Sequence, residues 1–209
     1  MTYYRRNYKR SKRKYPRRKR VYKRTFKRRT RGRTNKIYSF KRTFESAQIV
    51  CNASAGVTGA FSLALADVPG ASDFTNLFDQ YRICGVKINM VPVYDAALSS
   101  AINKFAMFSV IDYNDFNTIT MNQALEYQNV KRSTSVSGHR RYFKPRIAIQ
   151  QTDYSNNSFV ASYKPPWIST DDTNIAHGYM KYVTDTNSGS AAFTWNVYIT
   201  LYLQFRNVN

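Results

Sequence analysis

The stretch NVYITLYLQF, residues 196–205, constrains the fold of this 209-residue chain more than any other. Apolar side chains stand at every second position: Val197, Ile199, Leu201, Leu203 and Phe205. Because successive side chains of a β-strand point to opposite faces, a period of two predicts a strand that is covered on one face. Such a strand needs a second layer against its apolar side, so the stretch favours a layered β-protein.

Strand patterns recur along the chain. Runs of the same kind cover residues 37–51, 60–66 and 82–93, and the last of these brings Cys84 into line with apolar neighbours. The stretch KFAMFSVI, residues 104–111, is apolar on both faces. A strand of that composition belongs in the centre of a sheet with both faces covered.

One helix is predicted, over residues 72–81, SDFTNLFDQY. Ser72 can cap it, and Phe74, Leu77, Phe78 and Tyr81 recur at helical spacing. The polar stretches DYNDFNTITMNQ, KRSTSVSG and ISTDDTNIAHGYM are rich in Asn, Asp, Ser and Thr, and are therefore predicted to be loops. Many strands, long loops and one short helix predict an all-β fold, an antiparallel sandwich or jelly roll.

Charge divides the chain into two parts. The formal net charge is +21, yet residues 45–209 hold 12 basic and 12 acidic residues. The first 36 positions hold 19 cations and no acid: Arg5, Arg6, Lys9, Arg10, Lys12, Arg13, Lys14, Arg17, Arg18, Lys19, Arg20, Lys23, Arg24, Lys27, Arg28, Arg29, Arg31, Arg33 and Lys36. We therefore expect a nucleic-acid-binding arm, residues 1–36, before a folded body, residues 37–209.

The composition of the arm indicates what it binds. With so little apolar content it cannot offset its own ordering entropy, so we expect it to be disordered until phosphates neutralise it. Tyr8, Tyr15 and Tyr22 stand among the cations, and aromatic rings stack on unpaired bases, which favours a single-stranded partner. The alternative is that these rings anchor the arm inside a protein assembly. The clusters KRSKRK and RRKR also fit nuclear import signals.

Residues that carry catalysis are few. His139 and His177 are the only histidines, and neither belongs to a zinc-binding pattern, so we predict no metal, no cofactor and no enzyme. His139 stands beside two arginines and is interpreted as a surface or interface residue. Four aspartates lie in predicted loops and either form solvated turns or bind a hard cation: Asp112, Asp115, Asp171 and Asp172.

Cysteine usage and hydropathy add two expectations. Cys51 and Cys84 fall in strand-like runs and are predicted to be reduced core residues of a protein made in the cytosol. No window has the roughly 18 consecutive apolar residues of a membrane span, and no signal peptide is recognisable, so membrane insertion is not expected.

Several stretches, taken in order, resemble one known family. The Arg-rich start leads into IYSFKRTF. The strand pattern FDQYRICGVKINMVPV carries Tyr-Arg-Ile at 81–83, and GHRRYFKP carries an RYF-x-P segment at 141–145. Trp167 precedes a loop that contains His177, and NVYITLYLQFRNVN closes the chain. Together they resemble the coat proteins of the circovirus and cyclovirus group, which are small viruses with circular single-stranded DNA.

The resemblance implies an eight-stranded jelly roll that assembles as a sixty-subunit T=1 icosahedral shell, with the basic arms inside around the DNA genome. It further implies a virion protein that uses host nuclear import receptors and reaches the host cell nucleus during assembly. A sulfated polysaccharide is the attachment partner it suggests. The body residues to test for that role are Lys131, Arg132, Arg140 and Arg141.

Two other functions remain open from the residues alone. A cellular nucleic-acid-binding protein with a basic tail on a β-sandwich would stay monomeric and carry a basic face on its body, which the balanced charge of residues 45–209 disfavours. An enzyme on a β-sandwich would use Asp171 or Asp172 as an acid or base, but adjacent residues on a polar loop lack the environment that shifts a pKa.

Overall fold

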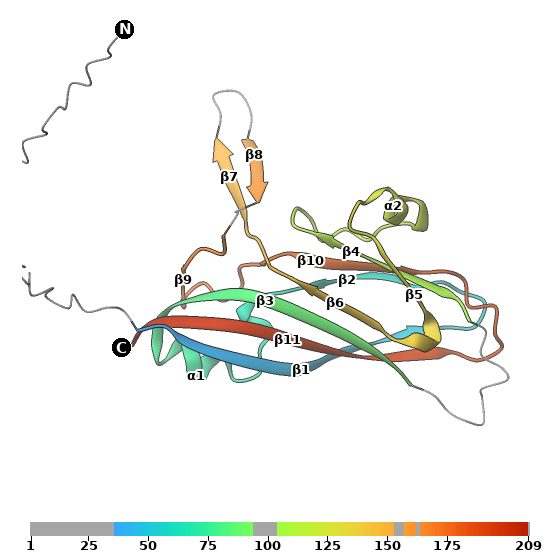
Figure 1. Cartoon of the computed structure of the whole chain (residues 1–209), viewed down its shortest axis with the longest axis horizontal. Helices are drawn as coiled ribbons and strands as arrows, with labels where there is room; N and C mark the ends of the chain where they lie inside the picture. The colour runs from blue at the N-terminus through green and yellow to red at the C-terminus, as the bar shows by residue number, and fades with distance from the viewer. Residues whose placement is uncertain (1–35, 94–103, 153–156, 162–163, 209) are drawn as a thin grey trace, which may run out of the picture. The chain divides into compact units, whose positions relative to one another are not determined.

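Two facing antiparallel sheets build the body of the protein (Figure 1). The computed structural model describes residues 36–93, 104–152, 157–161 and 164–208, and all of these side chains except those of residues 148–152 and 157–161. The first sheet has the order β1 (Tyr38–Cys51), β11 (Phe193–Val208), β3 (Phe78–Val93) and β6 (His139–Phe143), and β9 (Ile168–Ser169) pairs with β3. The second has the order β2 (Thr58–Ser62), β10 (Tyr179–Thr184), β4 (Ala106–Asp112) and β5 (Lys131–Thr134).

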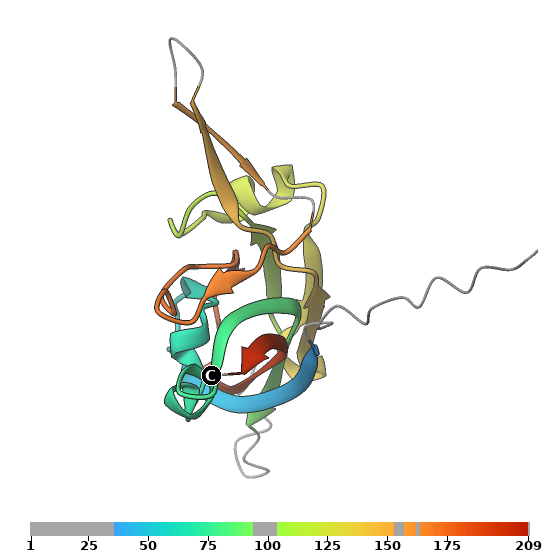
Figure 2. The same ribbon diagram turned by 90° about the vertical axis from the view of Figure 1, so that its left-hand side faces the viewer.

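The four strands in the order of each sheet, without the short β9, form the predicted eight-stranded jelly roll. The chain passes repeatedly between the sheets, so β1 and β3 belong to the first sheet whereas β2 and β4 belong to the second. A separate hairpin, β7 (Ala148–Thr152) and β8 (Asn157–Ala161), lies away from both sheets in the two views of Figures 1 and 2.

Strand β11 confirms the alternation that dominates the sequence. It pairs with β1 on one side and β3 on the other, and its apolar residues from Val197 to Phe205 are buried between the sheets. The Phe205 ring stacks on Phe74 at a centroid distance of 4.8 Å and contacts Phe78 at 5.1 Å and Phe40 at 5.7 Å. These rings form an aromatic cluster at one end of the core.

Strand β4 is buried at every position, as predicted. One of its faces contributes Met107 and Ile111 to the core between the sheets. The other contributes Phe108 and Val110 to a second apolar cluster, which also contains Ala124 of α2 (Met121–Glu126).

Helix α2 begins at Met121, inside the stretch 112–123 that was predicted to be a loop, so the prediction was wrong for the last three residues of that stretch. Thr120 caps the helix, because its Oγ1 accepts from the Gln123 amide at 3.3 Å and its own amide donates to Gln123 Oε1 at 2.9 Å. This reciprocal capping box is visible in the sequence as Thr120 followed three residues later by Gln123.

The predicted helix over residues 72–81 was too long. Helix α1 spans only Ala71–Thr75, and its N-cap is Gly70, at a φ of +75°, in place of Ser72. Phe78 and Tyr81 belong to β3, where Phe78 pairs with Val208 and Tyr81 with Phe205. Both rings are buried as expected, but pairing with β11 extends the backbone that the local spacing had assigned to a helix.

Three further details differ from the sequence prediction: a strand end, a missed strand and a register shift. The strand expected over 60–66 ends at Ser62, and the buried Leu65 begins a short 3-10 turn. The stretch 131–138, predicted to be a loop, contains β5. The register between β3 and β11 shifts at Cys84, so this residue is half-buried and out of line with Val86. Both cysteines are free thiols, and only Cys51 is fully buried.

Candidate functional site

The four basic residues predicted for polyanion attachment lie on two edge strands, one from each sheet. Arg140 on β6 is exposed and its Nε donates to Asn89 Oδ1 at 3.5 Å, on the side of the first sheet that faces away from the second. Arg132 on β5 lies 5.7 Å from the Phe108 ring, on the outer side of the second sheet. The four residues therefore do not form one patch.

The other two of these residues, Lys131 and Arg141, each donate a hydrogen bond to a backbone carbonyl. Lys131 Nζ donates to the Arg140 carbonyl at 2.6 Å, and Arg141 Nη2 donates to the Asn129 carbonyl at 2.7 Å. Lys131 stays exposed, whereas Arg141 is half-buried. Only Lys131 and Arg132 share a strand on which both side chains remain open to solvent.

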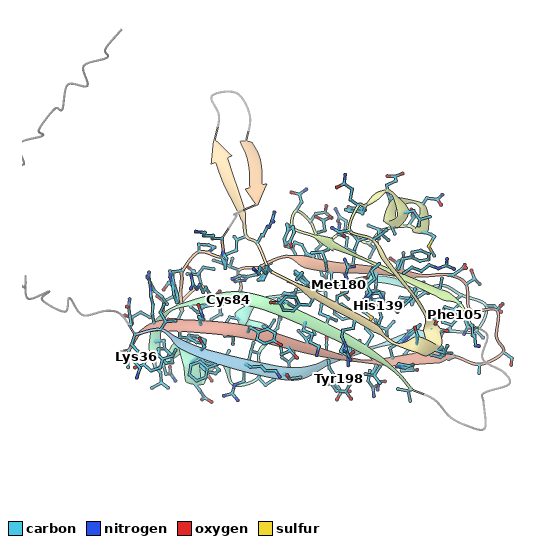
Figure 3. All side chains as sticks on the ribbon, viewed as in Figure 1. Lys36, Cys84, Phe105, His139, Met180 and Tyr198 are labelled. Atoms are coloured by element: carbon cyan, nitrogen blue, oxygen red, sulfur yellow. The ribbon has the colours of Figure 1, made fainter. Side chains whose placement is uncertain are left out.

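His139 is buried, so its interpretation as a surface or interface residue was wrong. It is 2% exposed, with Nε2 2.6 Å from Ser109 Oγ and Nδ1 2.6 Å from Ser133 Oγ. Because β6 belongs to the first sheet and the two serines to β4 and β5, the imidazole bridges the sheets (Figure 3). Burial, with Lys131 and Arg141 nearby, lowers the pKa of His139 to about 4, so the ring is neutral at pH 7.

His177 is also enclosed and neutral. Its Nδ1 lies 2.8 Å from the Ile175 carbonyl, and Nε2 has no hydrogen-bond partner among the described residues. Burial lowers the pKa of His177 to about 4, although backbone hydrogen bonds oppose that shift. Ser109 of β4, whose hydroxyl lies 2.6 Å from His139 Nε2, is fully buried and out of reach of a substrate.

Asp112 and Asp115 hold a buried lysine. Lys181 is 1% exposed, and its Nζ lies 2.7 Å from both Asp112 Oδ2 and Asp115 Oδ1. Each aspartate also accepts a hydrogen bond from the backbone amide two residues later in the chain, so the prediction that they form turns was right. Asp112, however, is buried and not solvated. Burial raises the pKa of Asp112, but hydrogen bonds from Lys181 and Asn114 outweigh it and hold the pKa below its usual value.

The remaining aspartates give no catalytic geometry. Asp171 and Asp172 are both exposed, and Asp171 Oδ2 accepts from the Ser169 hydroxyl at 3.0 Å. Within the described ranges, no group of three or more His, Cys, Asp or Glu side chains is arranged to hold a metal ion. None of the helices in those ranges is long and apolar enough to cross a membrane.

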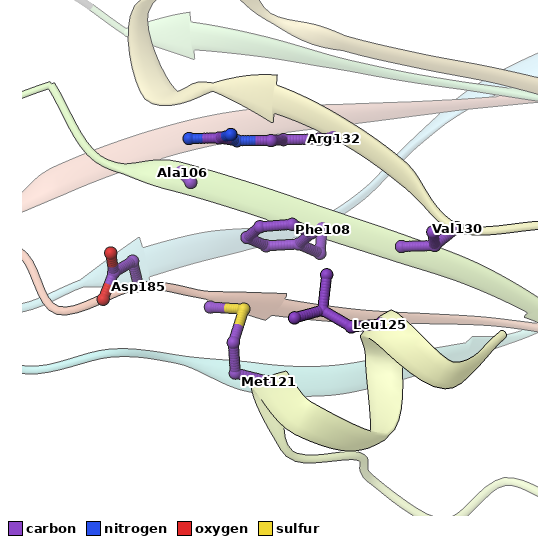
Figure 4. Close-up of a pocket in the computed structure, with 7 residues that line it drawn as sticks. All are labelled: Ala106, Phe108, Met121, Leu125, Val130, Arg132 and Asp185. Atoms are coloured by element: carbon purple, nitrogen blue, oxygen red, sulfur yellow. The ribbon is translucent and has the colours of Figure 1, made fainter.

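An apolar pocket of about 470 Å³ lies on the outer side of the second sheet (Figure 4). Phe108 of β4 forms its floor, while Met121 and Leu125 of α2 form one wall. Arg132 and Asp185 are its charged lining residues. The other lining side chains are apolar, so the pocket is suited to apolar contact.

One arrangement was missed in the sequence. Trp167, just before β9, lies between Arg82 of β3 and Arg206 of β11, and each guanidinium carbon is 4.4 Å from the indole centroid. Gln204 Oε1 accepts from Arg82 Nε at 2.8 Å, and Gln80 Oε1 accepts from Arg206 Nε at 2.7 Å. The alternation Gln80-x-Arg82 and Gln204-x-Arg206 was visible in the sequence, but the register that joins them was not.

Comparison with known proteins decides the family. The model of the circovirus capsid protein family matches residues 5–209. The chain belongs to the circovirus capsid protein family. Its members are structural proteins of the virion, so this chain has a capsid role, and the predicted resemblance is confirmed.

Solved structures agree on the fold of this capsid family member. The capsid protein of BFDV in a 60-mer crystal structure is 18% identical, with a TM-score of 0.67 over 83% of this chain and 95% of that one. The decameric BFDV capsid protein is also 18% identical, with a TM-score of 0.55 over 82% and 100%. Mud crab tombus-like virus gives 11% identity and a TM-score of 0.55 over 87% and 94%. No curated protein matches.

The predicted arm lies outside the described residues except for Lys36. The Lys36 ammonium is 5.0 Å from the Tyr38 ring, where β1 begins. Nucleic-acid binding by residues 1–36 stays a prediction.

Proposed function

We propose that this capsid protein self-assembles into a sixty-subunit T=1 icosahedral shell and packages circular single-stranded DNA through residues 1–36. The observation that carries the proposal is the division of charge in a member of a capsid family. A jelly-roll body with 12 basic and 12 acidic residues in positions 45–209 follows an arm with 19 cations.

Each part suits one task. A formally neutral body can pack against copies of itself without net repulsion, whereas a cationic arm neutralises phosphates and releases their counterions. The 60-mer reported for the BFDV capsid protein supports the subunit number. The arm's clusters of Lys and Arg support recognition by host nuclear import receptors and assembly in the nucleus.

The proposal is tested by sedimentation velocity with absorbance at 260 and 280 nm, on the full chain and on a chain that lacks residues 1–36. We expect uniform particles with nuclease-protected single-stranded DNA from the full chain, and no protected DNA without the arm. A matched control carries an arm of the same composition in scrambled order, and it should retain DNA because charge and not sequence binds phosphate. A monomer that binds nucleic acid in a salt-sensitive way would contradict the shell and favour a cellular nucleic-acid-binding protein.

Attachment to a sulfated polysaccharide is proposed for a narrower set than the four residues predicted. Lys131 and Arg132 are exposed on β5, whereas Arg140 lies on the opposite side of the sandwich and Arg141 is half-buried. We expect Lys131→Gln with Arg132→Gln to weaken retention of assembled particles on heparin. Unchanged retention would remove these two residues from the attachment site.

No catalysis is proposed. The exposed pair Asp171 and Asp172 offers no environment that would poise one carboxyl as an acid. Replacing both with asparagine should leave assembly unchanged, because both side chains are exposed.

A further inference from the structure

The first sheet has an open face, the side that points away from the second sheet, and this face collects cations. Register places five on it: Lys41, Arg82, Lys87, Arg140 and Arg206. Two acids belong to the same strands: Glu45 of β1, opposite Tyr198, and Asp79, an exposed residue of β3 beside Gln80. The body's balanced formal charge therefore hides a basic face, because the fold sorts positive side chains onto one side of one sheet.

Tyrosine rings lie at the centre of the open face. Tyr142 is 61% exposed, and its ring centroid is 6.2 Å from that of Tyr202. Gly85 makes room for it, since a Cβ at that position would lie 2.9 Å from the Tyr142 hydroxyl. Lys87 pairs with Tyr142 on one side and with Thr200 on the other, and Lys41 pairs with Tyr202. Cations thus flank a pair of rings on one continuous surface.

Arg82 and Arg206 are held in place at one end of this face by Trp167, as described above. Each is oriented by an indole face and a glutamine oxygen, and neither forms an ion pair with a carboxylate of the described residues. Guanidinium groups fixed in this way keep N–H donors for an external anion, and phosphate matches their fork geometry. Tyr38, the first residue of β1, pairs with Phe205 beside Arg206, so the chain of the arm joins the sheet at this end.

We propose that the open face of the first sheet is a second contact surface for single-stranded nucleic acid, which deepens the proposed packaging function and rests on it. Phosphates contact the five cations, and bases stack on Tyr142 and Tyr202, in the way that basic sheets with exposed rings hold single strands. A duplex suits the face less well, because its bases are already stacked on each other. Another copy of the same face is a poor partner, since two such faces would repel each other.

The test uses residue-resolved ultraviolet cross-linking of the full chain to a short oligothymidylate, read by mass spectrometry. We expect cross-links on peptides that contain Tyr142 and Tyr202 in addition to peptides of the arm. Substituting Lys41→Gln, Lys87→Gln and Arg140→Gln together should abolish the open-face cross-links. The matched control, Lys104→Gln with Arg146→Gln and Lys164→Gln, removes three exposed cations elsewhere and should keep the open-face cross-links.

Salt dependence of binding gives a second readout. Losing three phosphate contacts should reduce the slope of log affinity against log salt by about 2 in the open-face variant and leave it unchanged in the control. Tyr142→Ala should weaken binding roughly tenfold without changing the slope, since stacking contributes about 1 to 3 kcal/mol per base and no counterion release.

The outcomes separate this inference from the packaging proposal. Cross-links confined to arm peptides, or lost equally in the control, would overturn the open face as a binding surface and leave arm packaging intact. Absence of cross-links on the arm would contradict the packaging proposal itself. If the open-face variant changes particle assembly while its cross-links persist, the face contacts another subunit, and the inference is wrong.

Discussion

Charged side chains lie in solvent on the first sheet of the jelly roll, but the central charge of the second sheet is enclosed. The first sheet buries one face against the core and leaves the other open, with cations and tyrosines in solvent. The second sheet is covered on both sides of β4, by the core below and by α2 and its flanking chain above. Its central charge, Lys181, is enclosed with Asp112 and Asp115.

This difference separates residues that stabilise the fold from residues that are available for partners. A cation enclosed with carboxylates contributes to stability only as part of its pair, because removing one partner leaves an uncompensated buried charge. A cation on an open face contributes little to stability and can bind an external anion. Substitutions on the two sheets should therefore have effects of very different size.

Among single substitutions, the largest effect is expected in the core that both sheets share. Phe205→Ala should lower the free energy of unfolding by about 4 kcal/mol, since it removes a fully buried ring from the aromatic cluster. Urea unfolding of disassembled protein measures it. Leu125→Ala, at a side chain of α2 that is 56% exposed, is the control and should cost less than about 1 kcal/mol. Equal costs would mean that α2 contributes as much as the core.

Breaking the enclosed ion pair should have the next largest effect. Lys181→Ala should cost about 3 kcal/mol, because it leaves Asp112 buried without its cation. Joining it with Asp112→Ala should restore part of the loss. If the double variant is instead as unstable as the sum of the two single variants, the pair does not act as a unit, which a double-mutant cycle measures directly.

Acid should destabilise the fold through its two buried histidines. The pKa of His139 and of His177 is about 4 in the folded protein and about 6.5 when unfolded, so the unfolded chain binds more protons between these values. Stability should therefore fall as pH drops below 6.5, by roughly 3 kcal/mol per histidine at pH 4. Unfolding curves from pH 7 to pH 4 test the sign.

The contribution of each histidine can be separated by substitution. His139→Gln removes the group that titrates and should reduce the acid loss by roughly half of the combined histidine effect. The same change at His177 is the matched comparison. If neither substitution alters the loss of stability between pH 7 and pH 4, that loss comes from carboxylates and not from the histidines.

The smallest effect is expected on the open face. Lys87→Gln should change the free energy of unfolding by less than about 0.5 kcal/mol, because no carboxylate of the described residues pairs with Lys87. The same urea experiment measures it. A cost near that of Lys181→Ala would show that the two sheets do not differ in the way described here.

Strand content was predictable wherever a pattern was long. The alternation in β11 predicted a strand buried on one face, and the apolar run of β4 predicted a strand buried on both faces. Both predictions are confirmed. The helix over 72–81 failed because Phe74, Leu77, Phe78 and Tyr81 recur at helical spacing, although the chain is extended from Phe78 onward. Pairing with β11 decided between helix and strand, and no local signal could report a partner more than 120 residues away.

The candidate sites were predictable only in part. The basic residues around 131–141 were found, but their division between two sides of the sandwich follows from strand register. His139 was misplaced because its neighbours in sequence are charged, whereas its neighbours in space are Ser109 and Ser133. The Arg82–Trp167–Arg206 arrangement joins three separate segments and could not be read from any one of them.

The sequence by itself determined the β-fold, the neutral charge of the body and the concentration of cations in residues 1–36, because these depend on composition and on local periodicity. The tertiary structure decided which face each charge occupies, which histidines are buried and where β3 begins. Those properties depend on register between distant strands, since a shift of one residue moves a side chain to the other face of a sheet.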